Sequence, residues 1–89
     1  MNKLLKDLTK DIERKLRRQK KNFFEDVKNL HTRMLNDNSF ACLSYSYGRY
    51  NQLIDDALNY DIITYNTWRT LYIMGSRIED YCIHRGFER

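Results

Sequence analysis

The sequence predicts an all-α protein in which a long N-terminal helix packs on an antiparallel helical hairpin, as a three-helix bundle. The 89 residues include no Pro and only three Gly, whereas average usage would give about 4 Pro and about 6 Gly. Apolar residues recur at helical spacing, and candidate N-cap residues divide the chain into three segments. Because a chain this short forms one domain at most, we assign residues 1–89 to a single helical domain.

The first predicted helix covers residues 1–35 and is amphipathic. Its inward-facing positions advance by three or four residues at a time, with a mean step of about 3.6, the period of an α-helix. We call this row the apolar seam; it contains one polar member, Gln19, among Leu5, Leu8, Ile12, Leu16, Gln19, Phe23, Val27, Leu30 and Met34. The helix would reach ~45 Å but the hairpin only ~33 Å. Part of the seam, near Leu4 to Ile12, should therefore stay uncovered within one chain, and a homodimer would cover it.

A row of cations follows the same helix on another side. Residues 1–35 hold 11 Lys and Arg against 5 Asp and Glu, a net charge of +6, whereas residues 36–89 hold 5 against 7, a net charge of −2. We call six of these cations the basic stripe and predict that they bind nucleic-acid phosphates or an acidic partner: Lys6, Lys10, Arg14, Arg17, Arg18 and Lys21. The alternative is a solvated helix face, held by pairs such as Asp11 with Lys15 and Glu13 with Arg17.

Two further helices are predicted, over residues 39–60 and 64–85. The polar run from Asn36 to Ser39 suits a turn between helices. The second helix would bury a row at helical spacing, made up of Phe40, Leu43, Tyr47, Tyr50, Ile54 and Ala57. Thr64 is a suitable N-cap for the third helix, and Gly75 within it predicts a close backbone approach to a neighbouring helix. Strands over 40–47 and 62–74, which would make the fold α+β, are the alternative.

The second half of the chain is rich in aromatic residues and includes all seven Tyr. Buried hydroxyl groups need partners, so some of these side chains should be exposed. Tyrosine is enriched at protein interfaces. We therefore expect a protein-binding surface that includes Tyr45, Tyr50, Tyr65 and Tyr72.

Evidence for chemistry is sparse. Cys42 and Cys82 would lie at the same level of the hairpin, and His31 and His84 near the same end of the bundle, but the usual short zinc-ligand spacings are absent. Two small buried thiols are the favoured interpretation, with zinc binding or a disulfide as alternatives. No catalytic motif is present, so we expect a non-enzymatic protein without a cofactor. No apolar run reaches membrane-spanning length, and we expect a cytoplasmic protein with no membrane partner.

Lys, Asn, Ile and Tyr together supply 29 of the 89 residues, whereas Ala, Gly and Pro supply 2, 3 and 0. In this composition, over the whole chain, the protein resembles the small accessory and inhibitor proteins of phages and mobile elements of low-GC bacteria. The resemblance implies stoichiometric binding to a host protein or nucleoprotein complex, for example a CRISPR effector. We therefore expect a regulatory or inhibitory protein that binds through its basic helix. The alternative is a dimerising protein-interaction module that binds through its Tyr-rich hairpin without contacting nucleic acid.

Overall fold

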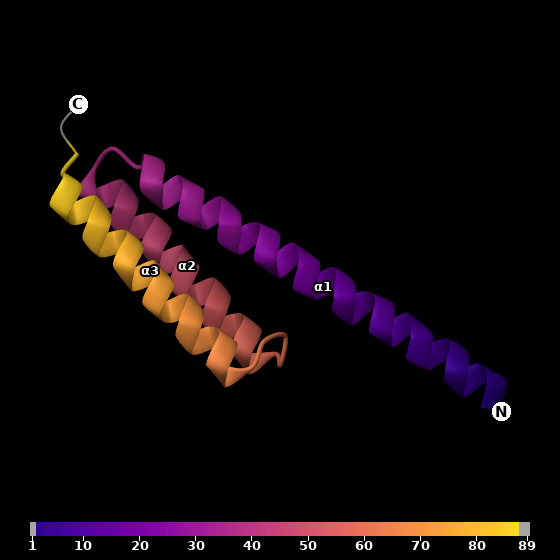
Figure 1. Ribbon diagram of the computed structural model, residues 1–89. Helices are drawn as coiled ribbons and strands as arrows, with labels where there is room; N and C mark the ends of the chain where they lie inside the picture. Colours follow the sequence, from indigo (N-terminus) through magenta and orange to yellow (C-terminus); the bar gives the residue numbers. More distant parts are fainter. Residues whose placement is uncertain (1, 88–89) are drawn as a thin grey trace.

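The computed structural model describes residues 2–87 and contains three helices (Figure 1). They are α1 (Asn2–Asn36), α2 (Phe40–Asn59) and α3 (Tyr65–Arg85). The all-α class is confirmed. The segments considered as possible strands belong to α2, α3 and the turn before α3, and residues 2–87 contain no strand.

Both hairpin helices begin at side-chain caps. The Ser39 hydroxyl accepts a hydrogen bond from the Cys42 amide at 3.1 Å, and Thr64 accepts one from the Thr67 amide at 3.3 Å. Each cap satisfies a backbone donor that the first helical turn leaves unpaired. Thr64 is therefore the N-cap that the sequence predicted.

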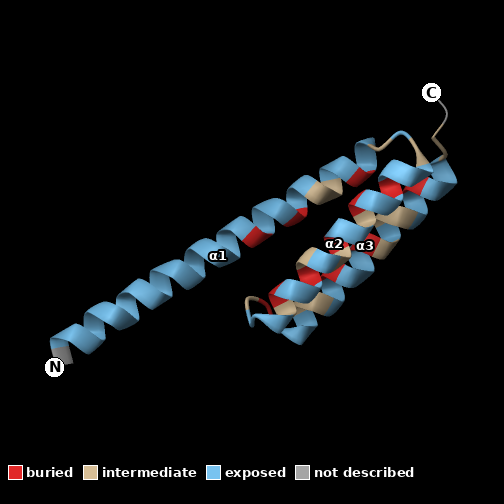
Figure 2. Cartoon of the chain, turned by 180° about the vertical axis from the view of Figure 1, so that it is seen from behind, coloured by how far each residue is buried: buried red, intermediate tan, exposed pale blue. Residues whose placement is uncertain are grey.

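The core lies where the C-terminal part of α1 meets the hairpin, as the buried residues in Figure 2 show. From α1 it takes the second part of the apolar seam. Its buried apolar members are Phe23, Val27, Met34, Leu43, Tyr50, Ile54, Ala57, Ile63, Leu71 and Cys82. Phe40, predicted to begin the inward row of α2, is instead 62% exposed. It occupies the first position of the helix, beyond the level at which α2 is enclosed.

The Tyr50 side chain of α2 packs on Gly75 of α3. A Cβ atom added to Gly75 would lie 2.4 Å from Cε1 of the Tyr50 ring. The Tyr50 hydroxyl donates a hydrogen bond to the Leu71 carbonyl. The sequence predicted a close backbone approach at Gly75. The space over the glycine is instead filled by a side chain, because the missing Cβ makes room for the Tyr50 ring.

Arg85 joins the end of α3 to the end of α1. Its guanidinium donates to the carbonyls of Leu35, at 2.7 Å, and Asp37, at 3.4 Å. The last carbonyls of a helix lack partners within it and carry partial negative charge. Arg85 therefore stabilises both the end of α1 and its connection to the hairpin.

The N-terminal part of α1 projects beyond the hairpin (Figures 1 and 2). We call residues 3–22 the free half of α1, because every one of them is exposed. The described chain measures 64 × 22 × 14 Å and has a Cα radius of gyration of 17.1 Å, against ~12 Å for a compact domain of this length. The uncovered seam expected near Leu4 to Ile12 is present and extends to Leu16. Among residues 2–87, no helix has both the length and the apolar character that crossing a bilayer requires.

Candidate binding surfaces

The basic stripe lies entirely on the free half of α1. All six side chains are exposed, and no part of the hairpin covers this stretch of helix. From Lys6 to Lys21 the stripe extends ~22 Å along the helix axis. It is therefore open to a long, straight anionic partner.

Two members of the stripe form ion pairs within the helix. Arg14 lies 4.0 Å from Asp11, and Arg17 lies 3.8 Å from Glu13. Asp11 thus pairs with Arg14 instead of Lys15, whereas the predicted pair of Glu13 with Arg17 is confirmed. For the other four members, no carboxylate within residues 2–87 lies inside 4.0 Å. Exposed pairs of this kind are weak, so phosphate groups can compete for both arginines.

Three of the four predicted contact tyrosines are exposed, but one is not. Tyr45, Tyr65 and Tyr72 are 56%, 61% and 45% exposed, whereas Tyr50 is completely buried. The prediction that Tyr50 contacts a partner is wrong, because its ring packs on Gly75 and its hydroxyl is bonded to Leu71. Burial raises the pKa of Tyr50 to about 12.

Tyr65 and Tyr72 belong to a column of three stacked rings on α3, with Trp68 between them. The ring centroids are 5.7 Å apart for Tyr65 and Trp68, and 5.3 Å apart for Trp68 and Tyr72. Trp68 also donates its indole N–H to Asp55 of α2 at 2.8 Å, which fixes the central ring. Sequence reasoning did not identify this aromatic column, although the spacing of three and four residues was a usable signal.

Tyr45 lies apart from the column, beside two arginines. The guanidinium carbons of Arg33 and Arg49 are 5.6 and 5.8 Å from its ring centroid. Arg49 donates to the Tyr45 hydroxyl at 3.1 Å, and this hydrogen bond is the main cause of the lowered pKa of Tyr45. The predicted tyrosines therefore do not form one surface, and both arginines were missed as its neighbours.

The four Cys and His side chains do not converge on a metal site. Cys42 is exposed, whereas Cys82 is buried with its thiol 3.3 Å from the Met34 carbonyl; both are free. The His31 ring lies 5.0 Å from the Tyr50 ring at an interplanar angle of 34°, and His84 bonds to the carbonyl of Asp80 in its own helix. Within residues 2–87, no group of three or more His, Cys, Asp or Glu could hold a metal. The expected equal height of Cys42 and Cys82 along the hairpin does not bring their thiols together, because Cys42 is exposed and Cys82 is buried. The favoured interpretation of two buried thiols therefore holds only for Cys82.

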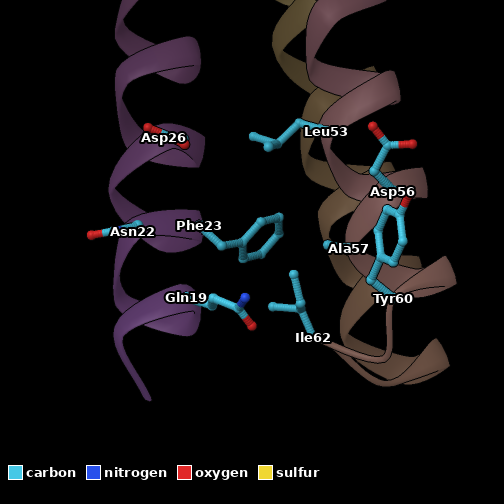
Figure 3. Close-up of a pocket in the computed structure, with 9 residues that line it drawn as sticks. All are labelled: Gln19, Asn22, Phe23, Asp26, Leu53, Asp56, Ala57, Tyr60 and Ile62. Atoms are coloured by element: carbon cyan, nitrogen blue, oxygen red, sulfur yellow. The ribbon is translucent and has the colours of Figure 1, made fainter. Parts of the chain in front are cut away.

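An apolar groove of about 250 Å³ opens where α1 separates from the end of α2 (Figure 3). Phe23 extends from α1 toward Ala57 and Ile62, and Leu53 lies above them. The groove is completed by Gln19, Asn22, Asp26, Asp56 and Tyr60. It begins at Gln19, one turn beyond Leu16, where the uncovered part of the apolar seam ends.

No protein-family model matches the sequence, and neither the curated proteins nor the solved structures include a significant match.

Proposed function

We propose that this chain is a non-enzymatic regulatory or inhibitory protein of the cytoplasm that binds nucleic-acid phosphates through the free half of α1. The observation that carries the proposal is the exposure of all six stripe cations on a helix segment that no other element covers. In keeping with its resemblance to small phage accessory proteins, it would act stoichiometrically on a host nucleoprotein complex, for example a CRISPR effector.

Phosphates suit this surface because it offers a line of exposed charge along one helix. Four stripe side chains have no carboxylate of residues 2–87 inside 4.0 Å, so they do not have to break an ion pair before they bind. The contacts would recognise a charged backbone and not a base sequence. Each phosphate neutralised on duplex DNA adds ~0.9 to the slope of log affinity against log salt, so four to six contacts predict a slope of about −4 to −5.

The test is a salt titration of labelled duplex DNA, RNA and single strands, followed by fluorescence anisotropy. We compare two double variants. One carries Arg14→Gln and Arg17→Gln, and the matched control carries Arg69→Gln and Arg77→Gln. Both variants lose two exposed arginines and the same net charge, but only the first alters the stripe. We expect the first to weaken binding and to lower the slope by about 2, and the control to change the slope little.

The outcome that contradicts the proposal is absence of binding to every polyanion at low salt. Equal losses in the two double variants would also contradict it, because they would indicate a response to total charge.

A second candidate function is protein binding through the aromatic column, with no nucleic-acid contact. It is favoured by the exposure of Tyr65 and Tyr72 on either side of a fixed Trp68. Under this alternative, Tyr65→Ala and Tyr72→Ala should each cost ~1 to 3 kcal/mol of binding to the partner. A partner captured from nuclease-treated lysate by the Arg14→Gln, Arg17→Gln variant, but not by the tyrosine variants, would support this alternative over nucleic-acid binding.

A further inference from the structure

The free half of α1 leaves a row of large apolar side chains in water. Leu4, Leu5, Leu8, Ile12 and Leu16 are 64%, 60%, 49%, 58% and 46% exposed. They continue the line that Phe23 and Val27 follow into the core, and nothing within residues 2–87 covers them. Contiguous apolar surface of this kind marks an interaction site.

The spacing of the uncovered seam is the same in both directions. From Leu5 to Gln19 the steps are 3, 4, 4 and 3 residues, with Ile12 at the centre. We propose that a second copy of this chain covers the seam, in an antiparallel two-fold pair of α1 helices centred on Ile12. Ile12 then meets its own counterpart, Leu8 lies opposite Leu16, and Leu5 lies opposite Gln19.

The pairing brings the N-terminal end of each copy to the groove of the other. In this register Leu5 of the second copy lies at the level of Gln19, where the groove begins. Each free half thus reaches the end of the layer that the hairpin of the other copy forms, with Leu4 and Leu5 at the edge of the groove.

Charge favours the same occupant. In this register residue i of one copy lies at the level of residue 24 − i of the other, so Lys15 of the second copy lies ~3 Å along the helix axis from Asp11 of the first. Asp11 and Lys15 lie on the same edge of the seam, and the two-fold axis gives the opposite pair, Lys15 with Asp11, at the equivalent place. One chain supplies both halves of this match, as a two-fold interface requires.

The positive charge of the two free halves does not oppose the pairing. The stripe lies on the side of α1 away from the seam, so the stripes of a dimer face outward on opposite sides. With helix diameters of about 10 Å they are separated by ~20 Å, more than twice the Debye length of ~8 Å at physiological salt. The dimer leaves both stripes exposed, so this proposal does not rest on the proposed function.

An anionic lipid surface is the competing occupant, since basic amphipathic helices also bind membrane interfaces. A membrane requires neither a symmetric spacing nor a groove at the end of the seam. Both features are present here, and they fit a second copy.

The first test is sedimentation equilibrium of the full chain at high salt without nucleic acid, over micromolar to millimolar concentrations. We compare wild type with Ile12→Asp at the centre of the seam and with Ile73→Asp, which alters a 40% exposed isoleucine of α3. We expect a dimer for wild type and Ile73→Asp, and at least a 100-fold larger dissociation constant for Ile12→Asp. Near-ultraviolet circular dichroism of Trp68 checks that the bundle stays folded in each variant.

The second test fixes the register by oxidative cross-linking in a Cys42→Ser background. Ile12→Cys should cross-link to itself, because the two positions meet on the two-fold axis. Leu5→Cys should not, because its counterpart lies ~21 Å away along the helix, beyond the 4.4 to 6.8 Å that a disulfide spans between Cα atoms. A mixture of Leu5→Cys and Gln19→Cys should cross-link.

Three outcomes overturn the proposal. The first is a monomeric wild type throughout the concentration range. The second is self-cross-linking of Leu5→Cys as fast as that of Ile12→Cys, which indicates a parallel pair. The third is a monomer that binds vesicles of anionic lipid and loses this binding on Ile12→Asp, which assigns the seam to a membrane. None of these measurements involves nucleic acid, so their failure is separate from failure of the proposed function.

Discussion

Tyr50 crosses from α2 to α3 in the middle of the bundle and makes two unlike contacts with the same helix. Its ring lies flush on Gly75, where no other residue would leave room, and its hydroxyl is bonded to the Leu71 carbonyl. A buried hydroxyl that lacked a partner would cost free energy. Tyr50 therefore sets the distance between α2 and α3 with its ring, and its buried hydroxyl has a hydrogen-bond partner.

The first prediction concerns Gly75→Ala. Alanine favours a helix by about 1 kcal/mol over glycine, but here its Cβ would enter the Tyr50 ring. We expect a net loss of about 1 to 3 kcal/mol in the free energy of unfolding, measured by chemical denaturation. Gly48→Ala is the control, since a Cβ at Gly48 meets nothing within 4 Å, and it should stabilise the protein. The loss at Gly75 should shrink in a Tyr50→Leu background; an undiminished loss would refute a clash with this ring.

The second prediction concerns His31, which is half-buried with its ring 5.0 Å from that of Tyr50. Burial lowers the pKa of His31 below 6.5. Below pH 6.5 the unfolded chain then binds more protons than the folded chain, so the free energy of unfolding should fall as the pH falls. The measurement is denaturation at pH values from about 8 down to about 5.5. Burial raises the pKa of Glu79, which acts with the opposite sign but equally in wild type and in a His31 variant.

His31→Gln should remove most of this dependence on pH. His84→Gln, at an exposed histidine, is the matched control and should leave it in place. A His31→Gln variant with the full wild-type dependence would contradict the assignment.

Tyr50 and Arg33, which lies beside Tyr45, show which contacts a sequence pattern cannot predict. Helical spacing placed Tyr50 in the row that faces the core, yet the abundance of tyrosine suggested that it was a contact residue. Only packing could decide, because a pattern reports which face a residue occupies and not what lies opposite it. Arg33 was missed for the same reason, since Arg33 and Tyr45 lie on different helices and meet only in three dimensions. Arg49 lies four residues from Tyr45 on α2, a helical spacing that the sequence did offer as a signal.

At the level of elements, α1 consists of two parts with the same apolar pattern but different surroundings. Its second part supplies Phe23, Val27 and Met34 to the core, and its first part supplies no buried residue among residues 3–22. The excess length was predictable from the lengths of the three expected helices alone. The groove at Phe23 was not, because it depends on how α1 diverges from the hairpin, which no periodicity encodes.

The third prediction is that a chain beginning at Gln19 keeps the three-helix core. Residues 3–18, which it lacks, are all exposed, so we expect the thermal midpoint to fall by only a few degrees. Polyanion binding should be lost, since only Lys21 of the stripe remains. Met34→Ala in the full chain is the contrasting control. Met34 is fully buried, and its truncation should cost about 2 to 5 kcal/mol. A shortened chain that fails to fold would show that the free half stabilises the bundle.

The whole molecule is a rod with its core at one end. Its 64 Å length and 14 Å thickness follow from the excess of α1 over the hairpin. The all-α class and the uncovered seam were both predicted from the sequence. Five of the six stripe residues were predicted as one row, because helical period determines which positions share a face. Arg18 lies ~100° around the helix from Arg17 and was included because it belongs to the densest run of cations, residues 14–21. The aromatic column of α3 was not identified, since single tyrosines were weighed one at a time.

The fourth prediction is that a monomer in solution is extended. Small-angle X-ray scattering of the Ile12→Asp variant should give a radius of gyration near the 17.1 Å of the Cα atoms. A chain whose free half folded back on the hairpin would approach ~12 Å. Scattering at several salt concentrations is the control, since repulsion among the stripe cations would expand the rod at low salt only.

The projecting free half also gives the molecule a large electric dipole. The net charge of +6 in residues 1–35 is concentrated toward one tip of a 64 Å rod, and the net charge of −2 lies around the other end. The field of a polyanion turns such a rod while it is still diffusing, so most encounters begin with the positive tip. Orientation before contact speeds association, and dissolved ions weaken it. Salt should therefore slow the arrival of the protein at a polyanion even before it loosens the complex that forms.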